Sequence, residues 1–208
     1  MNVRRPLKWL AAFACIAVAA GCTTSPPSRF YTLSGPATPA RAVAEYAVAV
    51  GPVSIPSVVD RPEIVVTIGE NEVWPDEFNR WAGPLADVIG LALVENLTAQ
   101  LRTPRVALLA QTALDDPDYR VVVAVQRFES VPGSHALVDA VYSVRRMKDG
   151  VAESGRATRR ETVPDRSYDA LAAAHSRAVA GVSGEIALAF GRIKAPAGPG
   201  TAASSPAR

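Results

Sequence analysis

The stretch Tyr119-Arg-Val-Val-Val-Ala-Val-Gln-Arg-Phe128 is apolar on both alternating faces through its middle. A strand buried on both sides lies at the centre of a sheet, so this stretch predicts a central strand. The segment from Ala136 to Arg146 follows after a loop at Pro132-Gly133 and predicts an antiparallel partner. Asp149-Gly150 is a typical hairpin turn and leads to a further strand that ends near Val163.

Shorter strands are expected on the N-terminal side of this hairpin. Runs of β-branched and aromatic residues between Gly, Pro or Asn indicate strands over residues 46–53, 64–68, 72–74 and 105–109. Groups of strands separated by helices, without strict alternation, are typical of an α+β fold.

Two long amphipathic helices are predicted to cover the sheet. In the first, over residues 81–101, an apolar residue recurs at every fourth position, namely Trp81, Leu85, Ile89, Leu93, Leu97 and Leu101. Asn79 is expected to cap this helix, and Pro104 to stop it. The second runs from about Tyr168 to Ile193, with His175 on its apolar stripe, which predicts a buried histidine and not a metal ligand. The sequence therefore predicts an α+β domain with both helices on one face of a mixed, mostly antiparallel sheet.

Charge and motifs argue against several classes of function. Three of the 22 basic residues lie in the first eight positions, so the remainder, with all 20 acidic residues, has almost no net charge and is not expected to bind nucleic acid. The basic run at residues 156–160 is interpreted as a solvated strand face. Neither His135, expected in an exposed turn, nor His175 has the spacing of a zinc ligand, and no nucleophile or phosphate-binding motif is present. We therefore predict a protein that is not an enzyme and has no metal or cofactor.

Residues 1–21 have the three parts of an export signal. Arg4, Arg5 and Lys8 supply positive charge, and residues 9–20 form an apolar run. As a helix these 12 residues would span only about 18 Å, which is too short for a permanent membrane span. The run ends in Ala19-Ala-Gly-Cys22, which resembles the lipobox of bacterial lipoproteins.

Cys22 is therefore the predicted lipid attachment site, where it would carry a diacylglycerol and an N-acyl chain. The other cysteine, Cys15, lies in the leader, so the mature chain has no pair of thiols for a disulfide. Thr23 follows Cys22 in place of Asp. By resemblance to the sorting pattern of enterobacterial lipoproteins, this favours the periplasmic face of the outer membrane over the inner membrane.

The chain after the leader is divided into three parts by its composition. Residues 22–28, rich in Ser, Thr and Pro, are expected to form a lipidated tether. Residues 29–194 are expected to form a single domain. Residues 195–208 hold Pro, Gly and Ala without large apolar side chains, which predicts a disordered tail.

Several segments carry a resemblance to a known family. They are Arg29-Phe-Tyr-Thr-Leu33, Val50-Gly-Pro-Val-Ser-Ile-Pro56 running into Asp60-Arg-Pro-Glu-Ile64, Asn79-Arg-Trp-Ala-Gly-Pro-Leu85, and Ala173-Ala-His-Ser-Arg-Ala178. In this order they resemble the PqiC-type family, also called ABC-type transport auxiliary lipoproteins. With the lipobox they span almost the whole mature domain.

This resemblance implies a function that composition does not show. Family members serve MCE-type systems, which move phospholipids or other hydrophobic molecules between the inner and outer membranes. The MCE protein forms a tunnel through the periplasm, and the lipoprotein is similar to a docking collar that ties the tunnel to the outer membrane. The implied partners are thus an MCE-domain tunnel protein, its inner-membrane permease and, since some members form rings, further copies of the chain.

Two polar and aromatic segments beside turns, Asp60-Arg61-Pro62 and Asn79-Arg80-Trp81, are candidate partner contacts. A structural role is favoured for Asn79 and Trp81. Arg61 and Arg80 could each form an ion pair within the chain or contact a partner.

Other functions stay open at this point. The chain could carry lipid in an internal cavity, act in envelope assembly without a role in transport, or be a periplasmic enzyme with no recognisable motif. Bound lipid or the identity of a co-purifying protein would separate these alternatives.

Overall fold

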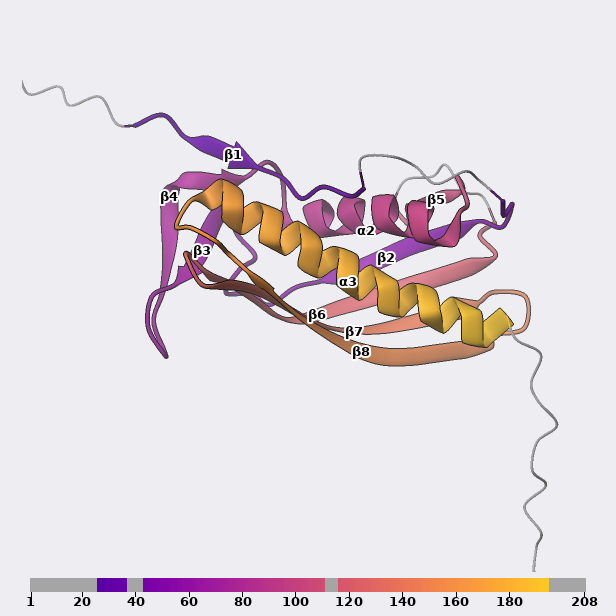
Figure 1. Ribbon diagram of the computed structural model, residues 1–208. Helices are drawn as coiled ribbons and strands as arrows, with labels where there is room; N and C mark the ends of the chain where they lie inside the picture. The colour runs from indigo at the N-terminus through magenta and orange to yellow at the C-terminus, as the bar shows by residue number, and fades with distance from the viewer. Residues whose placement is uncertain (1–25, 37–42, 111–115, 195–208) are drawn as a thin grey trace, which may run out of the picture.

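The computed structural model describes residues 26–36, 43–110 and 116–194 (Figure 1). The predicted leader, the lipid attachment site Cys22 and the predicted tail at residues 195–208 lie outside the described residues.

The larger of two sheets has five strands in the order β5-β2-β6-β7-β8. These strands are β2 (Val48–Ser54), β5 (Val106–Leu108), β6 (Tyr119–Val131), β7 (His135–Arg146) and β8 (Ala152–Thr162). The strand β2 is parallel to both β5 and β6, whereas β6, β7 and β8 are joined by long antiparallel pairings. The predicted central strand is therefore β6, which occupies the middle of the sheet.

A second, three-stranded sheet has the order β1-β4-β3. It contains β1 (Arg29–Tyr31), β3 (Glu63–Thr67) and β4 (Val73–Trp81), with β1 parallel and β3 antiparallel to β4. The α+β class is confirmed, but the strands are divided between two mixed sheets and not gathered in one. The strand β1 had no predicted counterpart, and β4 continues well beyond the predicted end at residue 74.

The first long helix, α2 (Leu85–Leu101), begins four residues later than its apolar spacing predicted. The Trp81 N–H donates to the Pro62 carbonyl at 2.8 Å, so Trp81 ends β4 and does not open the helix. Pro84 explains the difference, because a proline disfavours the helical conformation in the residue before it. The predicted cap at Asn79 is therefore wrong, and the helix begins directly after Pro84.

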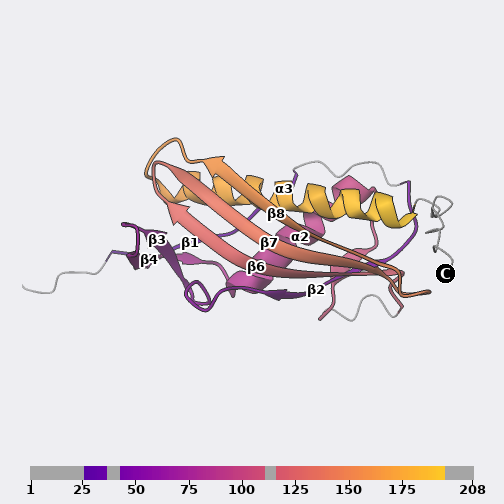
Figure 2. The same cartoon turned by 90° about the horizontal axis from the view of Figure 1, so that it is seen from below.

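Both helices pack on the same face of the five-stranded sheet (Figures 1 and 2). The helix α3 (Tyr168–Lys194) crosses β7 and β8, and α2 lies beside it over β2 and β5. The Ser167 hydroxyl caps α3 by accepting the Ala170 N–H at 3.1 Å. No helix of the described residues is long and apolar enough to cross a membrane.

A cluster of three rings joins the two sheets and α3. His175 of α3 is fully buried, as the sequence predicted, and stacks on Phe128 of β6 with ring centroids 3.9 Å apart. Trp81 of β4 meets Phe128 and His175 edge-on at 6.0 and 6.2 Å. The Nε2 atom of His175 lies 2.8 Å from the Ser130 hydroxyl, so this contact also ties α3 to β6.

We predict that protonation of His175 destabilises the fold. Burial lowers the pKa of His175 to about 3, whereas the unfolded chain keeps a value near 6.5. Below pH 6.5 the unfolded state therefore binds a proton that the folded state excludes. The free energy of unfolding should fall by up to about 1.4 kcal/mol per pH unit as the pH decreases from 6.5 toward 4.

Urea unfolding at several pH values checks this expectation. His175→Phe should reduce the dependence of the free energy of unfolding on pH between about pH 6.5 and 5.5, where ordinary carboxyl groups stay almost fully ionised. Ser130→Ala keeps the histidine, so its free energy of unfolding should depend on pH as that of the wild type does. Equal slopes in the wild type and His175→Phe would contradict the prediction.

Candidate partner-binding site

Parts of the segments that carry the family resemblance meet around β4, although they are far apart in the sequence; residues 50–54 lie instead in β2 of the larger sheet. The residues of β1 pair with the end of β4, so that Arg29, Phe30 and Tyr31 lie opposite Asn79, Arg80 and Trp81. The Tyr31 hydroxyl donates to Asn79 Oδ1 at 2.9 Å, which gives Asn79 a structural role different from the predicted helix cap.

The resemblance segment in α3, residues 173–178, contacts β4 and the residues after β1. His175 contacts Trp81, and the neighbouring Ser176 hydroxyl accepts the Ser34 N–H at 3.1 Å. Trp81 itself is 4% exposed, as expected for a core residue. Pro62, from the Asp-Arg-Pro segment, binds the Trp81 N–H through its carbonyl. The strands β1 and β4, the loop before β3, and α3 thus hold one another in place.

A surface groove of about 370 Å³ lies beside these elements. Residues 60–62 form one wall, and residues 81–85, at the turn from β4 into α2, form the other. Proline, alanine, glycine and leucine supply most of its lining, with the charges of Asp60 and Arg61 at the rim. Two of the resemblance segments therefore form the walls of a single groove.

Arg61 and Arg80 both form ion pairs with Glu63. The Arg61 Nε atom lies 3.3 Å from one Glu63 oxygen, and the Arg80 Nη2 atom lies 3.4 Å from the other. The side chains of Arg61 and Arg80 remain 47% and 37% exposed. Each guanidinium has five N–H donors, so the pairing orients both groups without using all their hydrogen-bonding capacity. The structure thus brings the two candidate residues together and shows their ion pairs within the chain.

The sequence reasoning missed Glu63, which holds both arginines. The alternation Arg61-Pro-Glu63 was the available signal, because alternate residues near the start of a strand project to the same side. The sequence gave no such signal for Arg80, because Arg80 comes near Glu63 only through the antiparallel pairing of β3 with β4.

The chemistry of this site suits binding. The groove combines an apolar lining with the guanidinium group of Arg61, and Arg80 pairs with the same Glu63 nearby. Such a surface can hold an apolar side chain and a carboxylate of another polypeptide. Within the described residues no group of His, Cys, Asp or Glu side chains could hold a metal ion. His135 lies near the surface, where burial and the charge of Arg160 lower its pKa, and its Nδ1 atom is 3.1 Å from Arg160 Nη2.

Fold and groove together describe a binding domain, and comparison with known proteins identifies its family. Residues 31–187 match the family described as ABC-type transport auxiliary lipoprotein component. The chain belongs to this family, which confirms the resemblance found in the sequence. No curated protein matches the chain.

Solved structures share the fold. The crystal structure of an uncharacterized protein superimposes with a TM-score of 0.65 at 19% identity, covering 79% of this chain and 99% of that chain. A Xanthomonas campestris protein of family DUF330 has a TM-score of 0.60 at 21% identity, covering 80% of this chain and 95% of its own. A PelC dodecamer from Paraburkholderia phytofirmans is more distant, with a TM-score of 0.40 at 18% identity over 73% of this chain and 93% of that chain.

We predict that the buried Trp81 contributes much more to the stability of the fold than the partly exposed Arg80 does. Trp81→Ala should lower the free energy of unfolding by about 3–5 kcal/mol, because it removes a buried ring between the two sheets. Arg80→Ala should lower it by less than about 1 kcal/mol, because its ion pair is partly exposed. Urea unfolding of the two variants and the wild type measures both values. A large loss with Arg80→Ala would assign that arginine a structural role.

Proposed function

We propose that this chain is an outer-membrane-anchored, non-catalytic accessory of an MCE/ABC-type intermembrane lipid transport system. In this role it ties an MCE-domain tunnel protein, and through it the inner-membrane permease, to the periplasmic face of the outer membrane. The family supplies the coarser assignment, an auxiliary lipoprotein of ABC-type transport.

The observation that carries the proposal is the groove at residues 60–62 and 81–85. Its walls come from segments that carry the family resemblance, Arg61 lines it, and Glu63 orients Arg61 together with the nearby Arg80. A surface with fixed donors and an apolar lining suits a protein contact, because orientation of the donors before binding lowers the entropy lost on association.

The position of the tether supports a docking role. Cys22 precedes Arg29, the first residue of β1, by seven residues, which can span at most about 25 Å. The strand β1 belongs to the small sheet (Figure 1), and its Tyr31 pairs with Trp81, which lines the groove. Lipid on Cys22 would therefore hold this end of the domain close to the membrane.

Lipid attachment at Cys22 is tested by the location of the protein in cells. Cys22→Ser should move the protein from the outer-membrane fraction to the soluble or inner-membrane fraction, because the thiol that accepts the lipid is absent. Mass spectrometry of the N-terminal peptide of the mature wild type should show diacylglycerol and an N-acyl chain on Cys22. An unmodified Cys22 would contradict the proposed anchor.

The groove is tested by charge reversal in the full-length protein. Arg61→Glu together with Arg80→Glu should reduce recovery of the MCE-domain protein in a pull-down by roughly tenfold, since both partner contacts become repulsive. The circular dichroism spectrum should stay unchanged. Glu63→Gln keeps both arginines but removes the carboxylate that orients them, so it should reduce recovery of the partner by less than the double reversal does.

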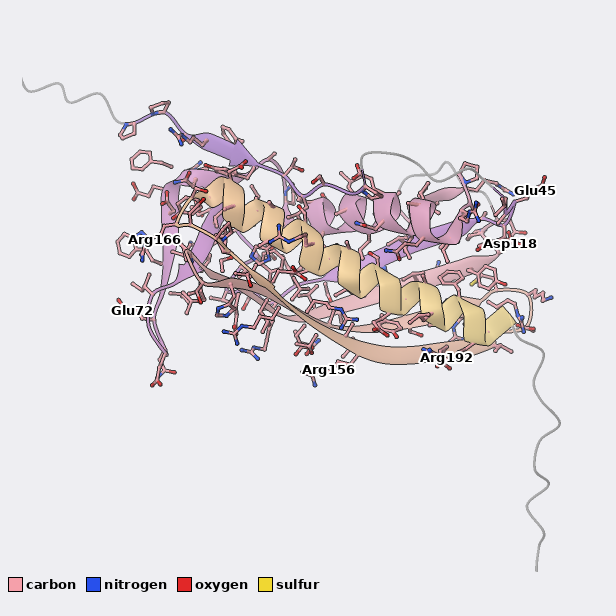
Figure 3. All side chains as sticks on the ribbon, viewed as in Figure 1. Glu45, Glu72, Asp118, Arg156, Arg166 and Arg192 are labelled. Atoms are coloured by element: carbon pink, nitrogen blue, oxygen red, sulfur yellow. The ribbon has the colours of Figure 1, made fainter. Side chains whose placement is uncertain are left out.

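A matched control reverses two arginines at the opposite end of the domain. They are Arg192→Glu (Figure 3) and Arg145→Glu, where Arg145 pairs with Ala152 at the start of β8. Arg192 also forms an ion pair, with Glu153 at 2.6 Å, so the control disturbs a comparable contact. Equal recovery from both double variants would reject the groove as the interface. Recovery of envelope-assembly proteins alone would instead support the alternative role. The size of the purified complex tests the predicted ring.

A further inference from the structure

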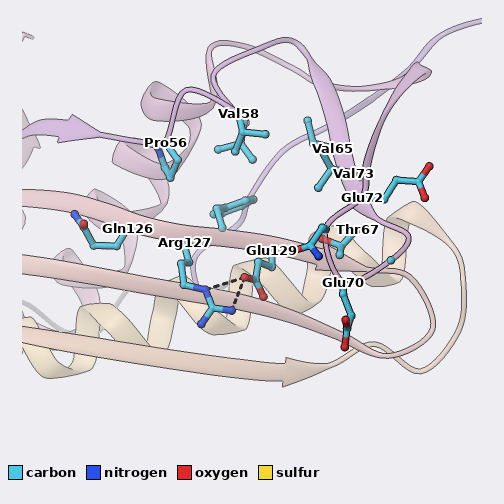
Figure 4. Close-up of a pocket in the computed structure, with 14 residues that line it drawn as sticks. Pro56, Val58, Val65, Thr67, Glu70, Glu72, Val73, Gln126, Arg127 and Glu129 are labelled. Carbon is cyan, nitrogen blue, oxygen red and sulfur yellow. Dashed lines mark hydrogen bonds and ion pairs between the residues drawn. The ribbon is translucent and has the colours of Figure 1, made fainter.

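A second groove, separate from the one that contains Arg61, lies between the β3–β4 hairpin and β6. It has a volume of about 300 Å³. Val58 lies across it from Val65 and Val73 of the hairpin, and Gln126 and Arg127 of β6 line another side (Figure 4). Val58 and Val73 are 51% and 46% exposed, so the groove offers apolar surface directly to its surroundings.

The charges of this groove are predominantly negative. Arg127 is neutralised by Glu129, with its Nε atom 2.7 Å from Glu129 Oε1. Glu70 and Glu72, in the turn of the hairpin, also line the groove. Neither forms an ion pair with a described residue. An occupant therefore meets apolar walls, and two uncompensated carboxylates lie beyond them on the hairpin, directed away from Val58 (Figure 4).

Size and charge limit what the groove can hold. A volume near 300 Å³ is at the lower end for binding drug-sized molecules, and a phospholipid with two acyl chains is much larger. The two carboxylates also oppose contact with an anionic membrane surface. A polypeptide that presents one apolar side chain between basic residues fits both the volume and the charge.

We propose that this groove is a second docking site, and that it binds a partner-protein segment with an apolar side chain flanked by Lys or Arg. The inference rests on the proposed function, because the partner is taken to be a protein of the same transport assembly. Both grooves lie at the end of the domain built on the small sheet, so one partner can engage them together.

Photo-crosslinking in the membrane-anchored, full-length protein tests this proposal. A photoreactive amino acid replaces Val73 in one variant and Val58 in a second, in case one position disturbs the hairpin. A third variant carries it at Ala82 in the first groove. Reporters in the second groove should crosslink to the same protein as the Ala82 reporter, at a peptide that contains Lys or Arg beside an apolar residue.

Charge reversal then tests the role of the carboxylates. Glu70→Lys with Glu72→Lys should lower the crosslink yield at position 73 about tenfold. The control, Glu45→Lys with Glu77→Lys, makes the same change in charge at exposed residues outside the groove and should leave the yield unchanged. Glu45 and Glu72 lie at opposite ends of the molecule (Figure 3).

The outcomes separate this proposal from the proposed function. Crosslinks from Ala82 to a transport protein, with none from positions 58 and 73, would overturn the second site and leave the function standing. Crosslinks from positions 58 and 73 only to lipid or to further copies of this chain would also overturn it. Absence of the transport protein from all three reporters would contradict both. Equal yields in the two double-lysine variants would reject the role of charge.

Discussion

The packing of Trp81 against Phe128 and His175 places a residue from each sheet and one from α3 in mutual contact. Trp81 ends β4, and the turn after it leads into α2, so the position of its ring fixes both the small sheet and the start of the helix. The first groove is formed by the chain on either side of this point. Its shape therefore depends on the packing of a tryptophan ring that is almost wholly buried.

Charge is distributed differently over the two ends of the domain. On the five-stranded sheet, three ion pairs join α3 to β8, namely Arg159–Glu185, Arg177–Glu161 and Arg192–Glu153. Such partly exposed pairs add little stability. At the small sheet, the hairpin carboxylates lack such partners among the described residues, and apolar side chains are exposed near them.

Periodicity was sufficient to predict β6, β7 and α3, because each is long and buries a continuous face or stripe. The mostly exposed β8 was predicted from the Asp149-Gly150 turn that precedes it. It was insufficient for β1, whose three residues are largely exposed and owe their conformation to pairing with β4. The spacing of Trp81 and Leu85 matched a helix by coincidence, since Pro84 separates a strand from a helix between them. Arg61 and Arg80 could be selected as polar residues beside turns, but their shared carboxylate depends on strand pairing, which a single sequence does not reveal.

The parallel pairing of β1 with β4 has a mechanical consequence. With Cys22 held in a bilayer, any pull on the domain is transmitted through the start of β1 along the strand axis. This direction loads the β1–β4 hydrogen bonds in shear, so they resist together and do not open one after another. Leu33, buried just beyond β1, and the Ser34–Ser176 hydrogen bond extend the same resistance into α3. A strand of three residues can therefore transmit force between a membrane and a folded domain.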